Sequence, residues 1–258
     1  MLWRFFVTEP SDGADNMALD EALLARARSH HEFVVRAYAW AVPTLSLGRN
    51  QRAIGVYNRA AARLRSVPIV RRLTGGRAVL HHREVTYSVT GPARRGDTLR
   101  ASYGTINDIL LQALRRLGVD ATLAAPVPET RFPAPASAPC FELPAPGEIV
   151  LGNRKLVGSA QVREDGAFLQ HGSILIDDDQ GLVSELSAAS VPATTPAATL
   201  RQALGRAPSL HEVAQALFES VQDHAGSAAA PLLVDDTLVT AVHSARERYI
   251  DDSWTWRR

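Results

Sequence analysis

Apolar residues recur at three- and four-residue spacing in four segments of the chain, and this period predicts four amphipathic helices. Two of them cover residues 15–29 and 102–117, and Gly118 is a typical residue to end the second. The third begins at a capping box formed by Ser209 and Glu212. The fourth lies near the end of the chain, and one of its faces carries Leu238, Val242, Ala245 and Tyr249.

Short apolar runs bounded by turn residues occupy the middle of the chain and predict six strands. We expect them at residues 68–73, 78–80, 85–90, 148–151, 155–163 and 167–176. The last three are separated by Gly152-Asn153 and by Glu164-Asp165-Gly166, which are typical of hairpin turns, so these strands should form an antiparallel meander. Helices outside a mixed or antiparallel sheet predict an α+β fold.

Residues 121–147 hold seven of the fifteen prolines. Such a segment can be neither a central strand nor a long helix, and its plainest interpretation is a linker. It also contains Cys140, and an exposed loop is where a reactive thiol would be placed.

The composition is that of an ordinary globular protein, with 258 residues, 46% hydrophobic and 21% charged. A net charge of +1 does not favour a nucleic acid or an anionic membrane as partner. The longest apolar stretch, residues 33–47, contains Arg36 and Pro43, which excludes a membrane span. The first ten residues include Arg4 and lack a cleavage site, so no secretory signal is predicted, and we expect the protein in the cytoplasm.

Cysteine and lysine, two residue types with reactive side chains, each occur only once in the chain. A single cysteine excludes an internal disulfide, and Cys140 is either a small buried hydrophobe or a reactive thiol. Lys155 is the only lysine among 28 Lys and Arg residues. It is either a compositional remainder or a position that requires a compact, titratable ammonium.

Two glycine-rich segments are candidate ligand walls. Gly75 and Gly76 follow a predicted strand between arginines, which suits an anionic or pantetheine-like ligand as well as it suits a simple tight turn. Residues 158–160 form a thin strand wall, and His171 interrupts an apolar run opposite them. His171 is either a satisfied core histidine or a ligand-facing one. The hairpin turn brings residues near Ser159 and His171 together, so both glycine-rich patches should face one groove.

Cys140 and Lys155 form the third candidate. A thiol must ionise before it attacks an ester or thioester, and a nearby ammonium favours that anion. An ammonium also donates hydrogen bonds to a carbonyl oxygen that gains charge during acyl transfer. The spacing permits the two side chains to meet but does not require it.

Five blocks, in order, resemble the biotin/lipoate protein ligase and octanoyltransferase superfamily. They are residues 16–22, residues 71–76 with His81, the Cys140-Phe141 step, residues 154–161 and residues 169–175. The similarity runs from about Trp3 to residues 254–258. It implies a biotin/lipoate protein ligase-like catalytic domain with mixed or antiparallel sheets flanked by helices. A single domain would span residues 1–258, with a catalytic core at about 32–225 and a C-terminal helical segment at 235–258.

Cys140 distinguishes the branches of this superfamily. ATP-dependent lipoate ligases resemble the chain elsewhere but typically carry an Asn-Asp step in place of the cysteine. Cysteine-dependent octanoyltransferases of the LipM type carry Cys-Phe and then a lysine fifteen residues after the cysteine, as Cys140, Phe141 and Lys155 do here. The resemblance implies transfer of an octanoyl group from octanoyl-acyl carrier protein to a lysine of a lipoyl-domain protein, such as the glycine-cleavage H protein, in lipoate biosynthesis. It implies no cofactor and no metal.

By the same resemblance, Cys140 would carry the acyl thioester, and Lys155 would favour the thiolate and orient the carbonyl. The acyl and pantetheine tunnel would be shaped by Arg71, Arg72, Thr74, Gly75, Gly76, His81, Gly158, Ser159, Ala160, His171 and Gly172. Two other interpretations stay open: an ATP-dependent lipoate-protein ligase, and a non-catalytic binder of lipoyl domains.

Overall fold

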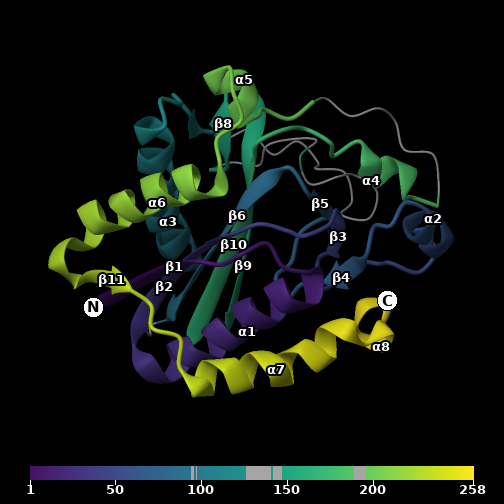
Figure 1. Ribbon diagram of the computed structural model, residues 1–258, viewed down its shortest axis with the longest axis horizontal. Helices are drawn as coiled ribbons and strands as arrows, with labels where there is room; N and C mark the ends of the chain where they lie inside the picture. The colour runs from purple at the N-terminus through teal and green to yellow at the C-terminus, as the bar shows by residue number, and fades with distance from the viewer. Residues whose placement is uncertain (94–95, 97, 126–140, 142–146, 189–195) are drawn as a thin grey trace.

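A mixed sheet forms the centre of the computed structural model, and helices cover both of its faces (Figure 1). The structure describes residues 1–93, 96, 98–125, 141, 147–188 and 196–258. The strands are β1 (Leu2–Val7), β2 (Glu32–Tyr38), β3 (Thr44–Leu47), β4 (Ile69–Arg71), β5 (Val79–His81), β6 (Glu84–Pro92), β7 (Thr122–Leu123), β8 (Ile149–Leu151), β9 (Arg154–Glu164), β10 (Ala167–Leu175) and β11 (Ala229–Pro231). The helices are α1 (Gly13–His30), α2 (Arg59–Leu64), α3 (Leu99–Arg116), α4 (Leu182–Glu185), α5 (Leu200–Leu204), α6 (Leu210–Ala225), α7 (Asp236–Ile250) and α8 (Asp252–Thr255).

The large sheet has the strand order β11-β1-β2-β6-β10-β9-β8-β7. Strand β1 runs parallel to β2 and β11, and the remaining neighbours are antiparallel. A small sheet with the order β4-β3-β5 lies beside it. The α+β fold and the antiparallel meander of β8, β9 and β10 are therefore confirmed.

The four predicted helices are confirmed as α1, α3, α6 and α7, and the six predicted strands as β4, β5, β6, β8, β9 and β10. The Ser209 side chain accepts a hydrogen bond from the Glu212 N–H, as the capping box predicts. Strands β1, β2, β3, β7 and β11 were not predicted. The central β2 is almost wholly buried, so it lacks the polar and apolar alternation that marks a half-exposed strand.

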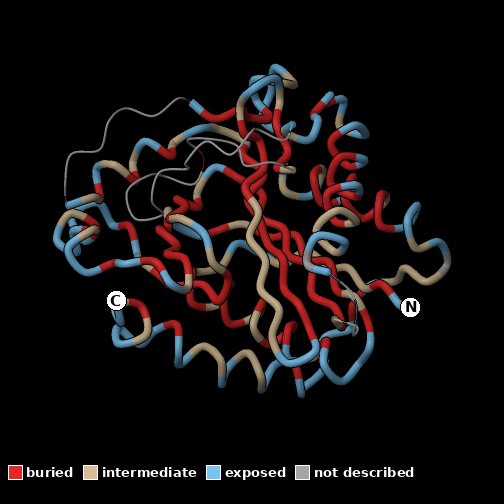
Figure 2. The backbone as a smooth tube through the Cα atoms, turned by 180° about the vertical axis from the view of Figure 1, so that it is seen from behind, coloured by how far each residue is buried: buried red, intermediate tan, exposed pale blue. Residues whose placement is uncertain are grey.

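The two faces of the large sheet differ in chemistry. Val35 and Val89, on β2 and β6, pack with Phe168 on β10 against α3 and α6 in an apolar core. The opposite face lies under α1 and α7 (Figure 1). There a row of directly paired positions crosses four strands, and it consists of Arg36, Ser88, His171 and Ala160. Three of the strands that carry this row, β2, β6 and β10, are buried almost throughout, whereas β9 is half-buried at Ala160 (Figure 2).

Among the described residues, no helix combines the length and the apolar character that crossing a bilayer requires.

Gly91 on β6 is a position where the packing of this sheet can be tested. A Cβ added there would lie 2.3 Å from a ring carbon of Phe33. We expect Gly91→Ala to lower the free energy of unfolding by about 1–3 kcal/mol, because the core is overpacked. Denaturant unfolding measures this change. The matched control is Gly181→Ala, where nothing lies within 4 Å and φ is −55°, and where stability should be unchanged or slightly raised. Equal stabilities of the two variants would contradict the packing at Gly91.

Candidate functional site

A pocket lies on the polar face of the large sheet, where β9 and β10 meet the loop after β4. Its lining residues come from α1, β2, β3, β5, β6, β9, β10 and the segment around Arg72. They are Met17, Tyr38, Ser46, Arg72, Gly76, Val79, His81, Thr86, Gly158, Ser159, Ala160, His171, Gly172 and Ser173. The two glycine-rich segments predicted to face one groove therefore do so.

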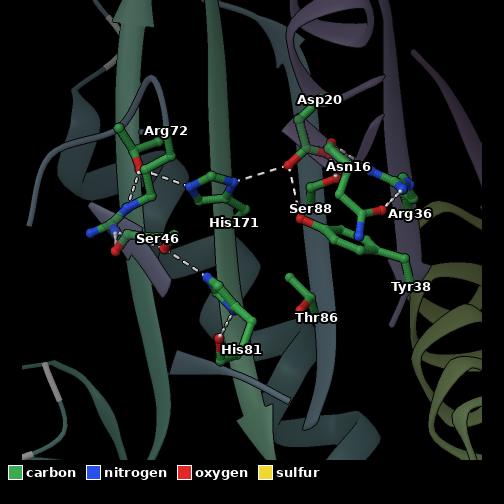
Figure 3. A network of polar contacts seen from close by, with 12 residues as sticks. Asn16, Asp20, Arg36, Tyr38, Ser46, Arg72, His81, Thr86, Ser88 and His171 are labelled. Carbon is green, nitrogen blue, oxygen red and sulfur yellow. Dashed lines mark hydrogen bonds and ion pairs between the residues drawn. The ribbon is translucent and has the colours of Figure 1, made fainter. Parts of the chain in front are cut away.

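His171 lines the pocket and lies between Thr74 and Asp20, and Figure 3 shows its ring turned toward Asp20. Its Nε2 is 2.7 Å from the Thr74 hydroxyl, and its Nδ1 is 3.0 Å from Asp20 Oδ2. An ionised carboxylate only accepts, so Nδ1 donates to Asp20, and in the neutral ring Nε2 then accepts from the Thr74 hydroxyl, whose oxygen also accepts from Arg72 Nε. The imidazole therefore carries its proton on Nδ1 and donates it to Asp20.

Asp20 is a buried carboxylate that accepts hydrogen bonds from side chains of several strands. It accepts hydrogen bonds from Arg36, Ser88 and Tyr38 at 2.8–3.0 Å. Burial alone would raise the pKa of Asp20, but the hydrogen bond from His171 and the charge of Arg36 outweigh it and lower the pKa. Burial lowers the pKa of His171 despite the opposing effect of Asp20. The pair is therefore an ionised aspartate and a neutral histidine.

His81 repeats the same arrangement on the neighbouring wall. Its Nε2 is 2.7 Å from the Ser46 hydroxyl, and its Nδ1 is 2.8 Å from Glu84 Oε1. Arg72 Nη1 donates to the Ser46 hydroxyl, as Arg72 Nε does to Thr74. The His81 ring stacks on Trp40 at 4.1 Å between centroids. Each histidine thus stands between a hydroxyl bonded to Arg72 and a buried carboxylate.

Arg72 connects the two walls and is almost completely buried (Figure 3). Its guanidinium makes five hydrogen bonds, to Thr74 Oγ1, Ser46 O, Ser46 Oγ, Gly75 O and Arg77 O, at 2.7–3.1 Å. A guanidinium has five N–H donors, so this side chain organises the wall with its whole donor set. The polar residues of the pocket bond to one another and leave a largely apolar interior.

Glycines let backbone approach where any side chain would collide. A Cβ at Gly172 would lie 2.5 Å from the Gly158 carbonyl oxygen, and one at Gly158 would lie 2.9 Å from the Phe141 ring. Gly76 has φ +91°, which favours glycine, and its carbonyl oxygen would be 2.0 Å from a Cβ at Gly48. These close contacts give the pocket its thin walls.

Arg71 lies outside the pocket. Its guanidinium donates to the backbone carbonyls of Gly48, Arg49 and Gln51 and to that of Thr255 in α8. Burial, with the charges of Arg257, Arg258 and Arg72, lowers the pKa of Arg71 to about 10. Of the two consecutive arginines, Arg72 therefore lines the pocket, and Arg71 binds the C-terminal helix α8 through the carbonyl of Thr255.

Lys155 is buried at the start of β9, where its Nζ forms a 2.7 Å ion pair with Glu148. The Phe141 ring centroid lies 5.2 Å from the same Nζ. Cys140 falls outside the described residues, so the predicted contact between its thiol and Lys155 stays a prediction. No group of three His, Cys, Asp or Glu side chains suited to a metal ion occurs within the described ranges.

Asp20, Ser46, Glu84 and Glu148 were not among the predicted site residues. Asp20 had a detectable signal, because it is a charge among the apolar positions Met17, Leu23 and Leu24 of α1. Ser46 meets His81 only through the fold. Glu84 and Glu148 lie near His81 and Lys155 in the sequence, but they belong to no motif that would mark them as partners.

The family described as the lipoyl protein ligase A/B catalytic domain matches residues 12–222. Lipoate-protein ligase A bound with ATP shares the fold with a TM-score of 0.82 and 21% identity, over 99% of both chains. Protein Ta0514 from T. acidophilum with bound lipoic acid shares it with a TM-score of 0.80 and 20% identity, over 99% of this chain and 100% of that one. The chain therefore belongs to the lipoyl protein ligase A/B catalytic-domain family.

Relatives that match over the full length identify the branch. Octanoyltransferase LipM from Kyrpidia tusciae is 38% identical over 272 residues, covering 99% of each chain. Octanoyltransferase LipM from an Exiguobacterium species is 35% identical, covering 99% of this chain and 98% of the relative. The chain is thus an acyltransferase of the LipM octanoyltransferase group, as the resemblance implied.

The neutral state of His171 has a consequence for stability that can be measured. Because the pKa of His171 is lowered in the folded state, the unfolded chain takes up a proton below about pH 6.5 that the folded chain does not. This contribution makes the free energy of unfolding fall as the pH is lowered from 7 towards 5, by at most about 1.4 kcal/mol per pH unit. We expect His171→Asn to flatten that slope. Denaturant unfolding at several pH values measures it, and equal slopes in the two proteins would contradict a neutral His171.

Proposed function

We propose that the protein transfers an octanoyl group from octanoyl-acyl carrier protein to the lysine amine of a lipoyl-domain protein, through a thioester on Cys140. The expected acceptor is the glycine-cleavage H protein. The observation that carries the proposal is the full-length similarity to octanoyltransferases of a chain that itself carries Cys140, Phe141 and Lys155. The domain division and the cytoplasmic location remain predictions from the sequence and belong to the same proposal.

The pocket supports an acyl ligand. The hydroxyls of Tyr38, Ser46 and Thr86 and both ring nitrogens of His81 and His171 are hydrogen-bonded to neighbouring side chains. A saturated acyl chain gains by leaving water and offers no hydrogen bonds of its own. A wall whose polar atoms are already satisfied matches that chemistry, and we assign the acyl chain to this pocket.

The surroundings of Lys155 support the thioester step. A buried ammonium stabilises a nearby anion, whether a thiolate or a carbonyl oxygen that gains charge. Phe141, the residue after Cys140 in the chain, contacts this ammonium. The adjacency supports Cys140 as the nucleophile that Lys155 assists.

The proposed reaction has two steps. The Cys140 thiolate attacks the carbonyl carbon of the donor thioester, a new C–S bond forms, and the carrier thiolate leaves. The acceptor lysine amine then attacks the carbonyl carbon of the acyl-enzyme, a C–N bond forms, the C–S bond breaks, and the proton released by nitrogen passes to the departing Cys140 thiolate. Both donors are thioesters and already activated, so neither step as written consumes ATP.

Mass spectrometry tests the covalent step. We expect the intact protein, mixed with octanoyl-carrier protein, to gain one octanoyl group that hydroxylamine removes, because hydroxylamine cleaves thioesters. Cys140→Ser should gain no hydroxylamine-labile group. The covalent mechanism would be wrong if the parent protein gains no octanoyl group, or if Cys140→Ser gains the same hydroxylamine-labile group. An ATP-dependent ligase would instead use free octanoate, release pyrophosphate and tolerate Cys140→Ala.

Ala160 tests the assignment of the pocket. Its side chain lines the pocket opposite Gly76, with 4.0 Å between its Cβ and a Cβ placed on that glycine. We expect Ala160→Leu to reduce kcat/KM for an octanoyl donor by about tenfold or more while affecting a butanoyl donor less, because it removes space that only the longer chain needs. Ala160→Ser is the control of similar size. An equal loss for both donors would place the acyl chain elsewhere.

A further inference from the structure

Glu148 and Lys155 form an ion pair that is almost closed to solvent. The exposed fractions of the two side chains are 10% and 2%, and Glu148 Oε1 lies 2.7 Å from Lys155 Nζ. Both residues belong to the β8–β9 hairpin region, where Val150 is directly opposite Lys155. Glu148 lies just before β8, next to a register irregularity between Ile149 and Val150, and its ion pair places its carboxylate against Lys155.

The backbone around Glu148 is fixed on several sides. The Ala124 N–H donates to the Glu148 carbonyl at 2.8 Å, and Gly147 N–H donates to the Ala124 carbonyl. The Asn107 side chain of α3 donates to the Gly147 carbonyl at 2.8 Å. The carboxylate is therefore held beside Lys155 by the sheet edge and by α3.

Burial favours the neutral form of an amine, whereas an adjacent carboxylate favours the ammonium. In the proposed reaction, the charge of the Cys140 thiolate disappears when the sulfur becomes acylated. The carboxylate of Glu148 persists through that stage. Lys155 thus keeps a counter-charge when the thiolate no longer supplies one.

A neutral lysine beside a thioester is a nucleophile. Its Nζ would attack the carbonyl carbon, a C–N bond would form, the C–S bond would break, and the proton released by nitrogen would pass to the departing thiolate. This is the same bond change that the acceptor lysine undergoes in the second step. The product would be an octanoyl amide on Lys155, which the enzyme has no thioester chemistry to reverse.

We propose that Glu148 is a positioning residue whose carboxylate keeps Lys155 an ammonium and thereby prevents transfer of the octanoyl group from Cys140 to Lys155. The inference rests on the proposed function, because it requires the Cys140 thioester. It goes beyond that function by giving Glu148 a protective role in addition to preserving the ammonium that assists Cys140.

The experiment compares the parent, Glu148→Gln, Glu148→Asp, and Glu148→Gln combined with Lys155→Arg. Each protein is incubated with octanoyl-carrier protein in the absence of an acceptor. The sample is treated with hydroxylamine and digested, and the peptide with residue 155 is examined by mass spectrometry. Glu148→Gln removes the charge at nearly constant size, Glu148→Asp retains it, and the double variant retains a cation but has no amine. Circular dichroism confirms that each protein is folded.

We expect hydroxylamine-resistant octanoyl on Lys155 in Glu148→Gln at about tenfold or more above the parent, which corresponds to about 1.4 kcal/mol of lost ammonium stabilisation. Glu148→Asp should form less of it, and the double variant none. A folded Glu148→Gln that carries the labile thioester but no amide would overturn the inference, as would equal amide in Glu148→Asp and Glu148→Gln. Amide on Lys155 of the parent at the level found in Glu148→Gln would overturn it as well. A parent that forms no labile adduct at all would instead refute the proposed function.

Discussion

The buried carboxylate of Asp20 is the interaction on which the site depends. It sits on α1 and accepts hydrogen bonds from side chains of β2, β6 and β10, so one residue ties the helix to the polar face of the sheet. A buried charge is tolerated only when it is paired and hydrogen-bonded, and Arg36 supplies the pairing charge. The position of α1, the proton on His171 and the orientation of Thr74 all follow from this one group.

The polar face differs from the apolar face in what it contributes. On the α3 and α6 side, shape and apolar area hold the sheet, and substitutions of similar volume are tolerated. On the α1 side, each polar group depends on the next, from Asp20 through His171 and Thr74 to Arg72 and from there to His81. A connected polar network of this kind admits few alternative arrangements. The pocket is thereby fixed in shape before any ligand arrives.

Local pattern was sufficient for the four long helices and the hairpins, because their periods and turn residues are contiguous in sequence, but it missed the short helices α2, α4, α5 and α8. It was insufficient for β1, β2 and β11, whose parallel pairing joins residues 2–7 to segments far along the chain. Arg36 was recognised only as a charge that interrupts an apolar run, and its partner Asp20 was not assigned. The pairing needs the fold, because the two residues meet only when α1 lies across β2.

The residues of the candidate site also fall into those that the sequence could predict and those that it could not. Thr74, Gly76, His81, Gly158 and His171 could be chosen from motif resemblance, and the structure brings them around one pocket or its wall. The sequence could not predict that the side chains of Arg71 and Arg72 point in different directions. Consecutive residues of an extended segment point to opposite sides, and the sequence does not say which side holds the pocket. Glu148 could not be predicted as a site residue either, because its importance comes only from its contact with Lys155.

The composition of the chain gives the Glu148–Lys155 pair a practical value. Lys155 is the only lysine, so a reagent that labels side-chain amines has one target in this protein. That target is 2% exposed and ion-paired, and labelling therefore requires the hairpin to open. The rate of labelling would report local opening of the β8–β9 hairpin, without an engineered probe.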